Sequence, residues 1–259
     1  MLSISAIPAF NDNYIWLLER SGQAVVVDPG DAEPVLKVLS EQGLSLTGIL
    51  ITHHHFDHVG GVEDLLAEQA VPVWGPHNPE IGSISQRLSA GDKIEVLGHS
   101  FSVLEVPGHT MDHIAYFHQP SDSASAPLLF CGDTLFAGGC GRMFEGTAEV
   151  MHRSLQLLAD LPADTLVYCA HEYTLANLEF ARAVEPDNAA LIERQQKAQR
   201  LRDLGQATVP SLLAEELATN PFLRCQTAEL QASLKAQGRL EGSSGAEVFA
   251  TVRAWKDTF

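Results

Sequence analysis

Short apolar runs separated by turn residues occupy the first two thirds of the chain. Apolar stretches on both sides of Ser21-Gly22 predict a β-hairpin. The other runs that predict strands lie at residues 2–10, 49–51, 71–74, 93–97, 101–106, 114–117, 128–131 and 165–169. Helical spacing predicts helices near residues 35–39, 62–66 and 148–158, the first of them ending at Gly43. Strands interleaved with helices predict an α+β fold of two sheets packed face to face, with helices outside.

Helical periodicity replaces the strand pattern after about residue 172. The predicted helices lie at residues 175–184, 188–204, 211–217 and 228–236. A last helix opens with Ser244 and Glu247, which match a capping box, and carries an apolar stripe that ends at Trp255. The change of pattern predicts two domains, residues 1–172 and residues 173–259.

The charge balance limits the partners that the chain can have. The formal net charge is -17 and the pI is about 4.9, which argues against binding to nucleic acid. No apolar run approaches membrane-spanning length, and the N-terminus has no basic signal region. The four cysteines form no CxxC pair, as expected in a reducing compartment. We therefore expect a cytoplasmic monomer that contacts neither nucleic acid nor a membrane.

One polar cluster interrupts the apolar pattern. Residues 52–61 read THHHFDHVGG and follow the predicted strand at 49–51 directly. Alternate residues of an extended segment point the same way, so His53 and His55 can share a face while His54 points away. Asp57 and His58 come next, before a glycine pair that allows a sharp turn. Imidazoles with a carboxylate suit zinc, iron or manganese, and two adjacent ligand groups suit two ions.

Three further polar residues, His109, Asp133 and His171, each follow a predicted strand. Loops at one rim of a sandwich could bring them to the cluster. A two-ion site needs a bridging group, and a carboxylate can bridge where imidazole normally cannot. Asp133 is the natural bridge, because Asp57 already belongs to the local pair with His58.

Other conspicuous stretches give no comparable signal. The Ser- and Pro-rich loop 119–127 is predicted to be solvated. The Gly-rich stretch 138–142 lacks the Lys-Ser/Thr ending of a phosphate-binding loop. Cys140 has no paired base nearby in sequence, which argues against a nucleophilic thiol. The remaining histidines lack ligand-like spacing and are expected to be structural or at the surface: His77, His99, His113, His118 and His152.

The pattern Thr-His-x-His-x-Asp-His, followed by single His, Asp and His at strand ends, resembles the metallo-β-lactamase superfamily. Four later stretches resemble the hydroxyacylglutathione hydrolase (glyoxalase II) family: residues 139–147, residues 170–174 with 177–178, residues 220–224 and residues 253–257. The resemblance covers essentially the full chain. It implies an αββα sandwich followed by a helical domain that binds glutathione.

The resemblance also implies roles for the ligand candidates. One metal ion would be held by His53, His55 and His109, and a second by Asp57, His58 and His171, with Asp133 bridging them. A water or hydroxide between two divalent ions, zinc foremost with iron or manganese as alternatives, would attack the thioester of S-D-lactoylglutathione. Asp57 and Asp133 would be the catalytic carboxylates that act with this hydroxide. The products would be glutathione and D-lactate, in the second step of methylglyoxal detoxification.

Glutathione ends in a carboxylate, so an acidic protein needs a local basic pocket to bind it. Arg253 and Lys256 are three residues apart and share one face of the last helix, where a solvated basic face is the alternative interpretation. The family resemblance makes Arg142, Arg253 and Lys256 the carboxylate-binding candidates and Tyr173 a hydrogen-bond donor. Phe144 stands where many relatives carry Tyr, and Asp112 stands where a small residue is common.

The residues leave other functions to be weighed. A mononuclear-iron glutathione persulfide dioxygenase of the same superfamily would use His55 or His53 with His109 and Asp133. The presence of His171 and the glyoxalase-like tail argue against this alternative. A non-enzymatic metal-binding scaffold is disfavoured by the complete ligand set. A lactamase is disfavoured by the lack of an export signal, and a nuclease by the acidic charge.

Overall fold

The computed structural model describes residues 2–121 and 125–259 and divides into two compact units. The first unit comprises Met1–Glu105 and Asp112–Gly132, and the second comprises Val106–Met111 and Asp133–Phe259. Each unit contains both strands and helices. This agrees with the α+β class predicted from the sequence.

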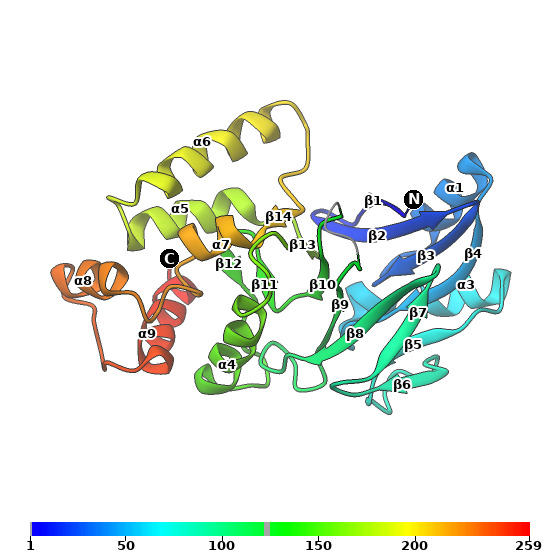
Figure 1. Cartoon of the computed structure of the whole chain (residues 1–259), viewed down its shortest axis with the longest axis horizontal. Coiled ribbons are helices and arrows are strands. Elements are labelled where there is room, and N and C mark those ends of the chain that lie inside the picture. The colour runs from blue at the N-terminus through cyan, green and yellow to red at the C-terminus, as the bar shows by residue number, and fades with distance from the viewer. Residues whose placement is uncertain (1, 122–124) are drawn as a thin grey trace. The chain divides into compact units, whose positions relative to one another are not determined.

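A six-stranded mixed sheet forms one layer of the first unit (Figure 1). Its strands follow one another in chain order: β1 (Ser3–Ala9), β2 (Asn13–Arg20), β3 (Gln23–Val27), β4 (Ser45–Leu50), β5 (Val73–Pro76) and β6 (Gln86–Leu88). β1 to β3 pair antiparallel, as the predicted hairpin requires, and β3 to β6 pair parallel. Parallel neighbours need crossover connections, and helices supply the first two of them.

Helix α1 (Ala32–Gln42) connects β3 to β4, and α2 (Phe56–Val59) with α3 (Val62–Glu68) connects β4 to β5. The Asp31 side chain accepts a hydrogen bond from the Glu33 amide and caps α1. Gly43 ends α1 with a left-handed φ of 64°, so the predicted C-cap is confirmed. The apolar sides of α1 and α3 pack with Val26 and Ile49 of the sheet in one buried cluster.

Four antiparallel strands form the second layer of the first unit: β7 (Lys93–Val96), β8 (His99–Glu105), β9 (Ile114–His118) and β10 (Leu128–Gly132). The buried Tyr116 hydroxyl on β9 donates to the carbonyls of Ile51 and Trp74, at 2.8 and 3.2 Å. This contact ties β9 to the first sheet, and the predicted face-to-face sheets are confirmed. Residues 122–124 of the loop predicted to be solvated lie outside the described residues.

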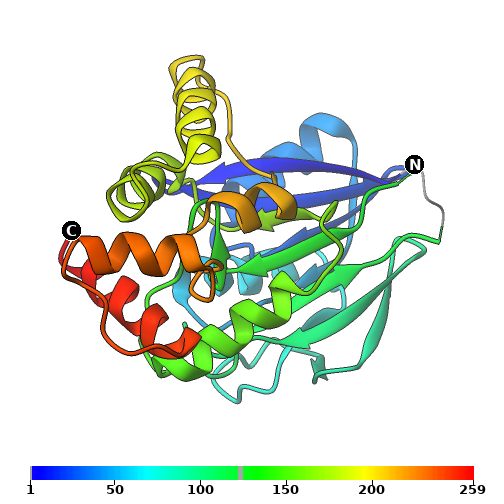
Figure 2. The same ribbon diagram turned by 60° about the vertical axis from the view of Figure 1, so that its left-hand side comes forward.

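The second unit contains most of the helices. They are α4 (Ala148–Ala159), α5 (Thr174–Val184), α6 (Ala189–Asp203), α7 (Leu213–Thr219), α8 (Ala228–Ala236) and α9 (Gly245–Asp257). α4 and α9 lie side by side in Figure 2. Ser244 and Glu247 form the predicted capping box at the start of α9. No helix in the described ranges is long and apolar enough to cross a membrane.

The second unit also contains short strands that the sequence pattern did not indicate. β11 (Leu135–Phe136) and β12 (Gly139–Cys140) pair as a hairpin. Ser211 and Leu212 form β14, which pairs with β13 (Leu166–Cys169), so α7 starts two residues later than the helix predicted from residue 211. Ser211 and Leu212 are extended because they pair with a strand that is distant in sequence, and local periodicity does not indicate such pairing.

Candidate metal centre

Two neighbouring parallel strands set the position of the histidine cluster. β3 and β4 pair with Val27 opposite Leu50, so their carboxyl ends lie at one edge of the sheet. Asp28 follows β3, and its carboxylate accepts hydrogen bonds from the Thr52 amide and the Thr52 hydroxyl, both at 2.7 Å. These bonds are buried and fix the start of the cluster.

The structure brings His53 and His55 together, in keeping with the alternation of an extended segment. The distance from His53 Nε2 to His55 Nδ1 is 3.1 Å. His53 is fully buried and its Nδ1 lies 3.0 Å from the Thr52 hydroxyl. Two ring nitrogens therefore face a common point at the end of β4.

Asp57 and His58 lie on α2, the single helical turn that follows His55. Asp57 Oδ2 lies 3.5 Å from His58 Nε2 and accepts a hydrogen bond of 2.9 Å from the side-chain amide of Asn13. On the other side of the ring, His58 Nδ1 lies 3.1 Å from Asp28 Oδ2. A carboxylate at one ring nitrogen orients the imidazole and directs the other nitrogen toward a metal ion.

Gly30 makes the close packing of α2 possible. A Cβ atom built at Gly30 would lie 1.9 Å from the backbone oxygen of Asp57, which no side chain can tolerate. The loop between β3 and α1 can therefore approach α2 only because residue 30 has no side chain.

His54 has a different partner from its neighbours. Its Nδ1 lies 3.0 Å from Asp112 Oδ1, and Asp112 Oδ2 accepts a hydrogen bond of 2.8 Å from the side-chain amide of Asn78. Asp112 is thus the partner of His54, which accounts for a carboxylate at a position where a small residue is common in the family.

The second unit holds the other three predicted ligands around one carboxylate oxygen. Asp133 Oδ2 lies 3.4 Å from His109 Nε2 and 3.3 Å from His171 Nε2. All three side chains are buried. His109 Nδ1 donates to the Arg142 carbonyl at 2.8 Å, so in the neutral ring Nε2 is the unprotonated nitrogen that can bind a metal ion. The His171 ring stacks on Tyr173, with centroids 4.8 Å apart.

The donor sets of both units fit divalent metal ions. Two donors that each lie ~2.0–2.1 Å from a tetrahedral ion are about 3.3 Å apart. The four donor–donor distances above are 3.1, 3.5, 3.4 and 3.3 Å. Neutral imidazoles and ionised carboxylates gathered at such spacing are what zinc, iron and manganese require.

The predicted substrate-binding residues lie in the second unit. Arg142 is exposed, and Phe144 is 64% exposed, with its ring at 72° to the His109 ring and a centroid distance of 5.3 Å. Lys256 donates to the Ala176 carbonyl at 3.2 Å. Partial burial lowers the pKa of Lys256, and repulsion by Arg253 adds to the effect.

Arg253 differs from these residues because it is only 3% exposed. Its guanidinium donates to the Asp257 carboxylate at 2.8 and 3.1 Å and to the Cys140 carbonyl at 3.2 Å. The face on which Arg253 lies is therefore not simply a solvated basic surface. Burial also raises the pKa of Cys140 to about 11, so its thiol is not a nucleophile at neutral pH.

The sequence interpretation missed Asp28, Asn13 and Gly30 as supports of the site. Asp28 carried a usable signal, because it follows an apolar strand in the same way as the histidine cluster does. Asn13 and Gly30 stand in turn segments, where Asn and Gly are common for local reasons. Only the fold shows that both contact Asp57.

Comparison with protein families accounts for nearly the whole chain. Residues 9–171 match the model described as metallo-beta-lactamase superfamily. Residues 172–259 match the model described as hydroxyacylglutathione hydrolase C-terminus.

Curated relatives are similar over their full length. The chain is 52% identical over 262 residues to the hydroxyacylglutathione hydrolase of Pseudomonas fluorescens (strain SBW25), with 100% of both chains covered. It is 53% identical to the enzyme of the same name from Pseudomonas aeruginosa strain PAO1, again with 100% of both covered.

Solved structures are more distant. ETHE1 from Myxococcus xanthus has a TM-score of 0.63 and 26% identity, with 100% of this chain and 99% of that chain covered. TTHA1623, crystallised in a di-iron-bound form, has a TM-score of 0.53 and 28% identity, with 65% of this chain and 91% of that chain covered.

Proposed function

The chain belongs to the hydroxyacylglutathione hydrolase family of the metallo-β-lactamase superfamily, and on that premise we propose that it hydrolyses S-D-lactoylglutathione to glutathione and D-lactate. This reaction is the second step of methylglyoxal detoxification. The observation that carries the proposal is the sequence identity of 52% and 53% to hydroxyacylglutathione hydrolases over the entire chain, including the helical tail. The chain is accordingly a metal-dependent hydrolase.

We propose that two divalent ions occupy the site, with zinc the foremost candidate and iron or manganese the alternatives. One ion would be held by His53, His55 and His109, the other by Asp57, His58 and His171, with Asp133 bridging. Support comes from the donor spacing within each unit and from the similarity to TTHA1623, which was crystallised with two irons.

Bound divalent ions would lower the pKa of an intervening water toward neutrality and polarise the thioester carbonyl. The protein's own part is to hold the donors in place and to keep them in the correct protonation state. Asp28 and the Arg142 carbonyl each fix one ring nitrogen of a ligand histidine. Asp57 and Asp133 supply the negative charge that matches the cations. The glutathione thiolate is a good leaving group and needs little acid assistance.

The glutathione part of the substrate is assigned to exposed groups of the second unit. We propose that Arg142 and Lys256 contact the glycine carboxylate, and that Tyr173, which is 38% exposed, donates a hydrogen bond to the peptide. Phe144 would pack against the substrate where a Tyr would add a hydroxyl contact. Arg253 remains in the set, although most of its donors are already engaged.

We also propose that the chain acts as a monomer in the cytoplasm. All four cysteines are buried and none forms a disulfide, which suits a reducing compartment.

One assay tests the function. Purified protein is analysed for metal, and the loss of thioester absorbance is followed with S-D-lactoylglutathione. Chelation should abolish hydrolysis, and adding Zn²⁺ back should restore it. Metal-loaded protein that leaves the thioester intact would refute the proposal. Oxygen uptake with glutathione persulfide, by protein holding a single iron, would favour the dioxygenase alternative instead.

A further inference from the structure

The hairpin β11–β12 connects two parts of the proposed metal centre. It begins two residues after Asp133 and ends two residues before Arg142, whose carbonyl accepts the hydrogen bond from His109. Each strand is only two residues long, paired as Leu135 with Cys140 and Phe136 with Gly139. A ladder this short has little stability of its own, so other groups must hold the hairpin in place.

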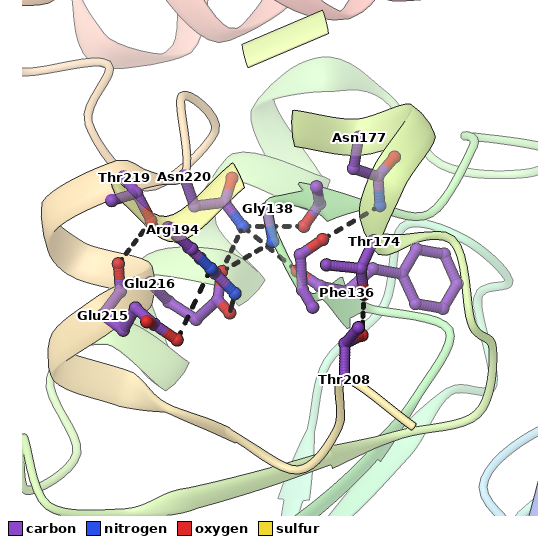
Figure 3. Close-up of polar contacts among 12 residues, drawn as sticks. Phe136, Gly138, Thr174, Asn177, Arg194, Thr208, Glu215, Glu216, Thr219 and Asn220 are labelled. Atoms are coloured by element: carbon purple, nitrogen blue, oxygen red, sulfur yellow. Dashed lines mark hydrogen bonds and ion pairs between the residues drawn. The ribbon is translucent and has the colours of Figure 1, made fainter. Parts of the chain in front are cut away.

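Side chains from α5, α7 and α9, together with Asn220 at the C-cap of α7, bind every residue from 136 to 140 through its backbone, and Figure 3 shows contacts to Phe136 and Gly138. The Gly138 amide donates to the Glu216 carboxylate at 2.9 Å. Asn220 donates to the carbonyls of Phe136 and Gly139, at 3.2 and 2.9 Å. Two further donors complete the set: Asn177 binds the Ala137 carbonyl at 3.2 Å and Arg253 binds the Cys140 carbonyl at 3.2 Å.

Glu216 lies at the centre of these contacts and is fully buried with Arg194 as its ion-pair partner. It also accepts a hydrogen bond from Asn220 at 3.1 Å. Burial opposes ionisation of Glu216, but the charge of Arg194 and the hydrogen bonds outweigh it and keep the pKa of the carboxyl below its usual value. The group is therefore a carboxylate at neutral pH, and an ionised acceptor holds an amide more strongly than a neutral one.

Close packing links the hairpin to the ligands. A Cβ atom built at Gly141 would lie 2.0 Å from the Asp133 carbonyl oxygen and 2.9 Å from His109 Nδ1. The Gly141 amide also donates to the Thr134 carbonyl at 3.3 Å. Gly141, the residue directly after the hairpin, therefore packs against both Asp133 and His109, so a shift of the hairpin would be passed on to them.

We propose that Glu216, held by Arg194, is a positioning residue for the metal ligands Asp133 and His109. The inference rests on the proposed metal centre. Buried ion pairs are poor contributors to stability but can specify one geometry among several, and here the geometry is that of the ligand-bearing hairpin. The helical tail thereby takes part in building the metal centre as well as in binding substrate.

The test compares Glu216→Gln with Glu215→Gln as the matched control. Glu215 neighbours Glu216 and also faces Arg194, with a separation of 3.5 Å, but its other ion-pair partner is Lys197 of the same helix as Arg194. Zn²⁺ affinity is measured by chelator competition, and the visible spectrum of the Co²⁺-loaded protein reports ligand geometry. Glu216→Gln should lower Zn²⁺ affinity by about 10-fold and alter the Co²⁺ spectrum, since supports of metal ligands have effects of this size. Glu215→Gln should do neither.

Kinetics separate positioning from general loss of structure. Glu216→Gln should lower kcat and leave KM within about twofold, because substrate contacts remote from the metal are intact. If Glu216→Gln does not fold, Arg194→Met with Glu216→Gln leaves no unpaired buried charge and carries the same expectation.

Unchanged Zn²⁺ affinity and an unchanged Co²⁺ spectrum in the folded variant would overturn the inference, even if the melting temperature fell. Failure of the wild-type protein to bind metal or to hydrolyse the thioester would instead refute the proposed function. The two failures are therefore distinguishable.

Discussion

Asp28 Oδ2 lies 3.1 Å from Nδ1 of His58 while the same carboxylate binds the backbone and hydroxyl of Thr52. One buried side chain thus orients a proposed ligand and anchors the segment that carries two others. Asp28→Asn keeps the shape but weakens both functions, so Zn²⁺ affinity should fall by ~10–100-fold. Chelator competition measures the loss.

Asp31→Asn is the matched control, because Asn caps a helix about as well as Asp and residue 31 lies in the same loop. Equal Zn²⁺ affinities for the two variants would mean that Asp28 does not support the metal site.

Gly30 should tolerate no side chain. Gly30→Ala places a methyl group 1.9 Å from the Asp57 carbonyl oxygen, and the resulting displacement should cost about 1–3 kcal/mol of unfolding free energy. Gly82→Ala has open space around it and should stay within ~0.5 kcal/mol of wild type. Urea denaturation measures both variants. A Gly30→Ala protein as stable as Gly82→Ala would contradict the packing described for α2.

Lys256→Ala should raise KM for the glutathione thioester by about 10-fold and leave kcat nearly unchanged. The reason is that a charge-assisted hydrogen bond to a carboxylate remote from the reacting carbon stabilises substrate and transition state alike. Lys235→Ala, at the end of α8, removes the same charge from the protein and should leave KM unchanged. A comparable fall in kcat and rise in KM for Lys256→Ala would argue against its role in binding.

Arg253→Ala with Lys256→Ala should raise KM further than Lys256→Ala alone, and more than it lowers kcat. A part of this effect should be structural, since Arg253 holds the Cys140 carbonyl and the Asp257 carboxylate. Steady-state kinetics and thermal unfolding of the double variant measure the two contributions. No fall in melting temperature would show that the buried guanidinium does not stabilise the tail.

The start of α9 should weaken in acid. Hydrogen bonds from the Ser244 and Ser243 amides and the Ser244 hydroxyl lower the pKa of Glu247 to about 2. A depressed pKa gives stability that is present above the unfolded value of about 4.5 and is lost as pH falls toward 2. The difference in unfolding free energy between wild type and Glu247→Gln should therefore shrink between about pH 5 and pH 3. Urea denaturation of both proteins at each pH measures it. A difference independent of pH would rule out the ionised capping box.

The native thiols should resist modification. Burial raises the pKa of Cys140 to about 11 and that of Cys169 to about 12, and it also raises that of Cys225. Cys131 is buried as well. An aromatic disulfide reagent near pH 8 should react slowly with the folded protein. After denaturation it should react rapidly with all four thiols. Rapid reaction of one thiol in the native state would contradict the buried placement.

The periodic signals gave the layered fold, because strand alternation and helical spacing are local properties of the chain. The strand-end rule likewise selected His109, Asp133 and His171, each of which follows a strand and lies beside the others in the second unit. The residues that hold the proposed ligands in place could not be predicted from such local patterns. Glu216 contacts Gly138 across 78 positions of sequence, and no local pattern marks such a pair. Helical periodicity likewise predicts a helix at Ser211, although this residue pairs with Val167 on a distant strand.

Val106–Met111 belongs to the second unit although the chain on both sides of it belongs to the first. Within this segment, Gly108 accepts a hydrogen bond from the Gly146 amide and packs against Met151. During synthesis these six residues leave the ribosome before the residues from 133 onward that they pack with. The partners of His109 in the folded protein, the Arg142 carbonyl and the Asp133 carboxylate, are therefore made only after His109 itself. Cutting the gene after residue 132 would place this segment on one fragment and the residues that it packs with on the other.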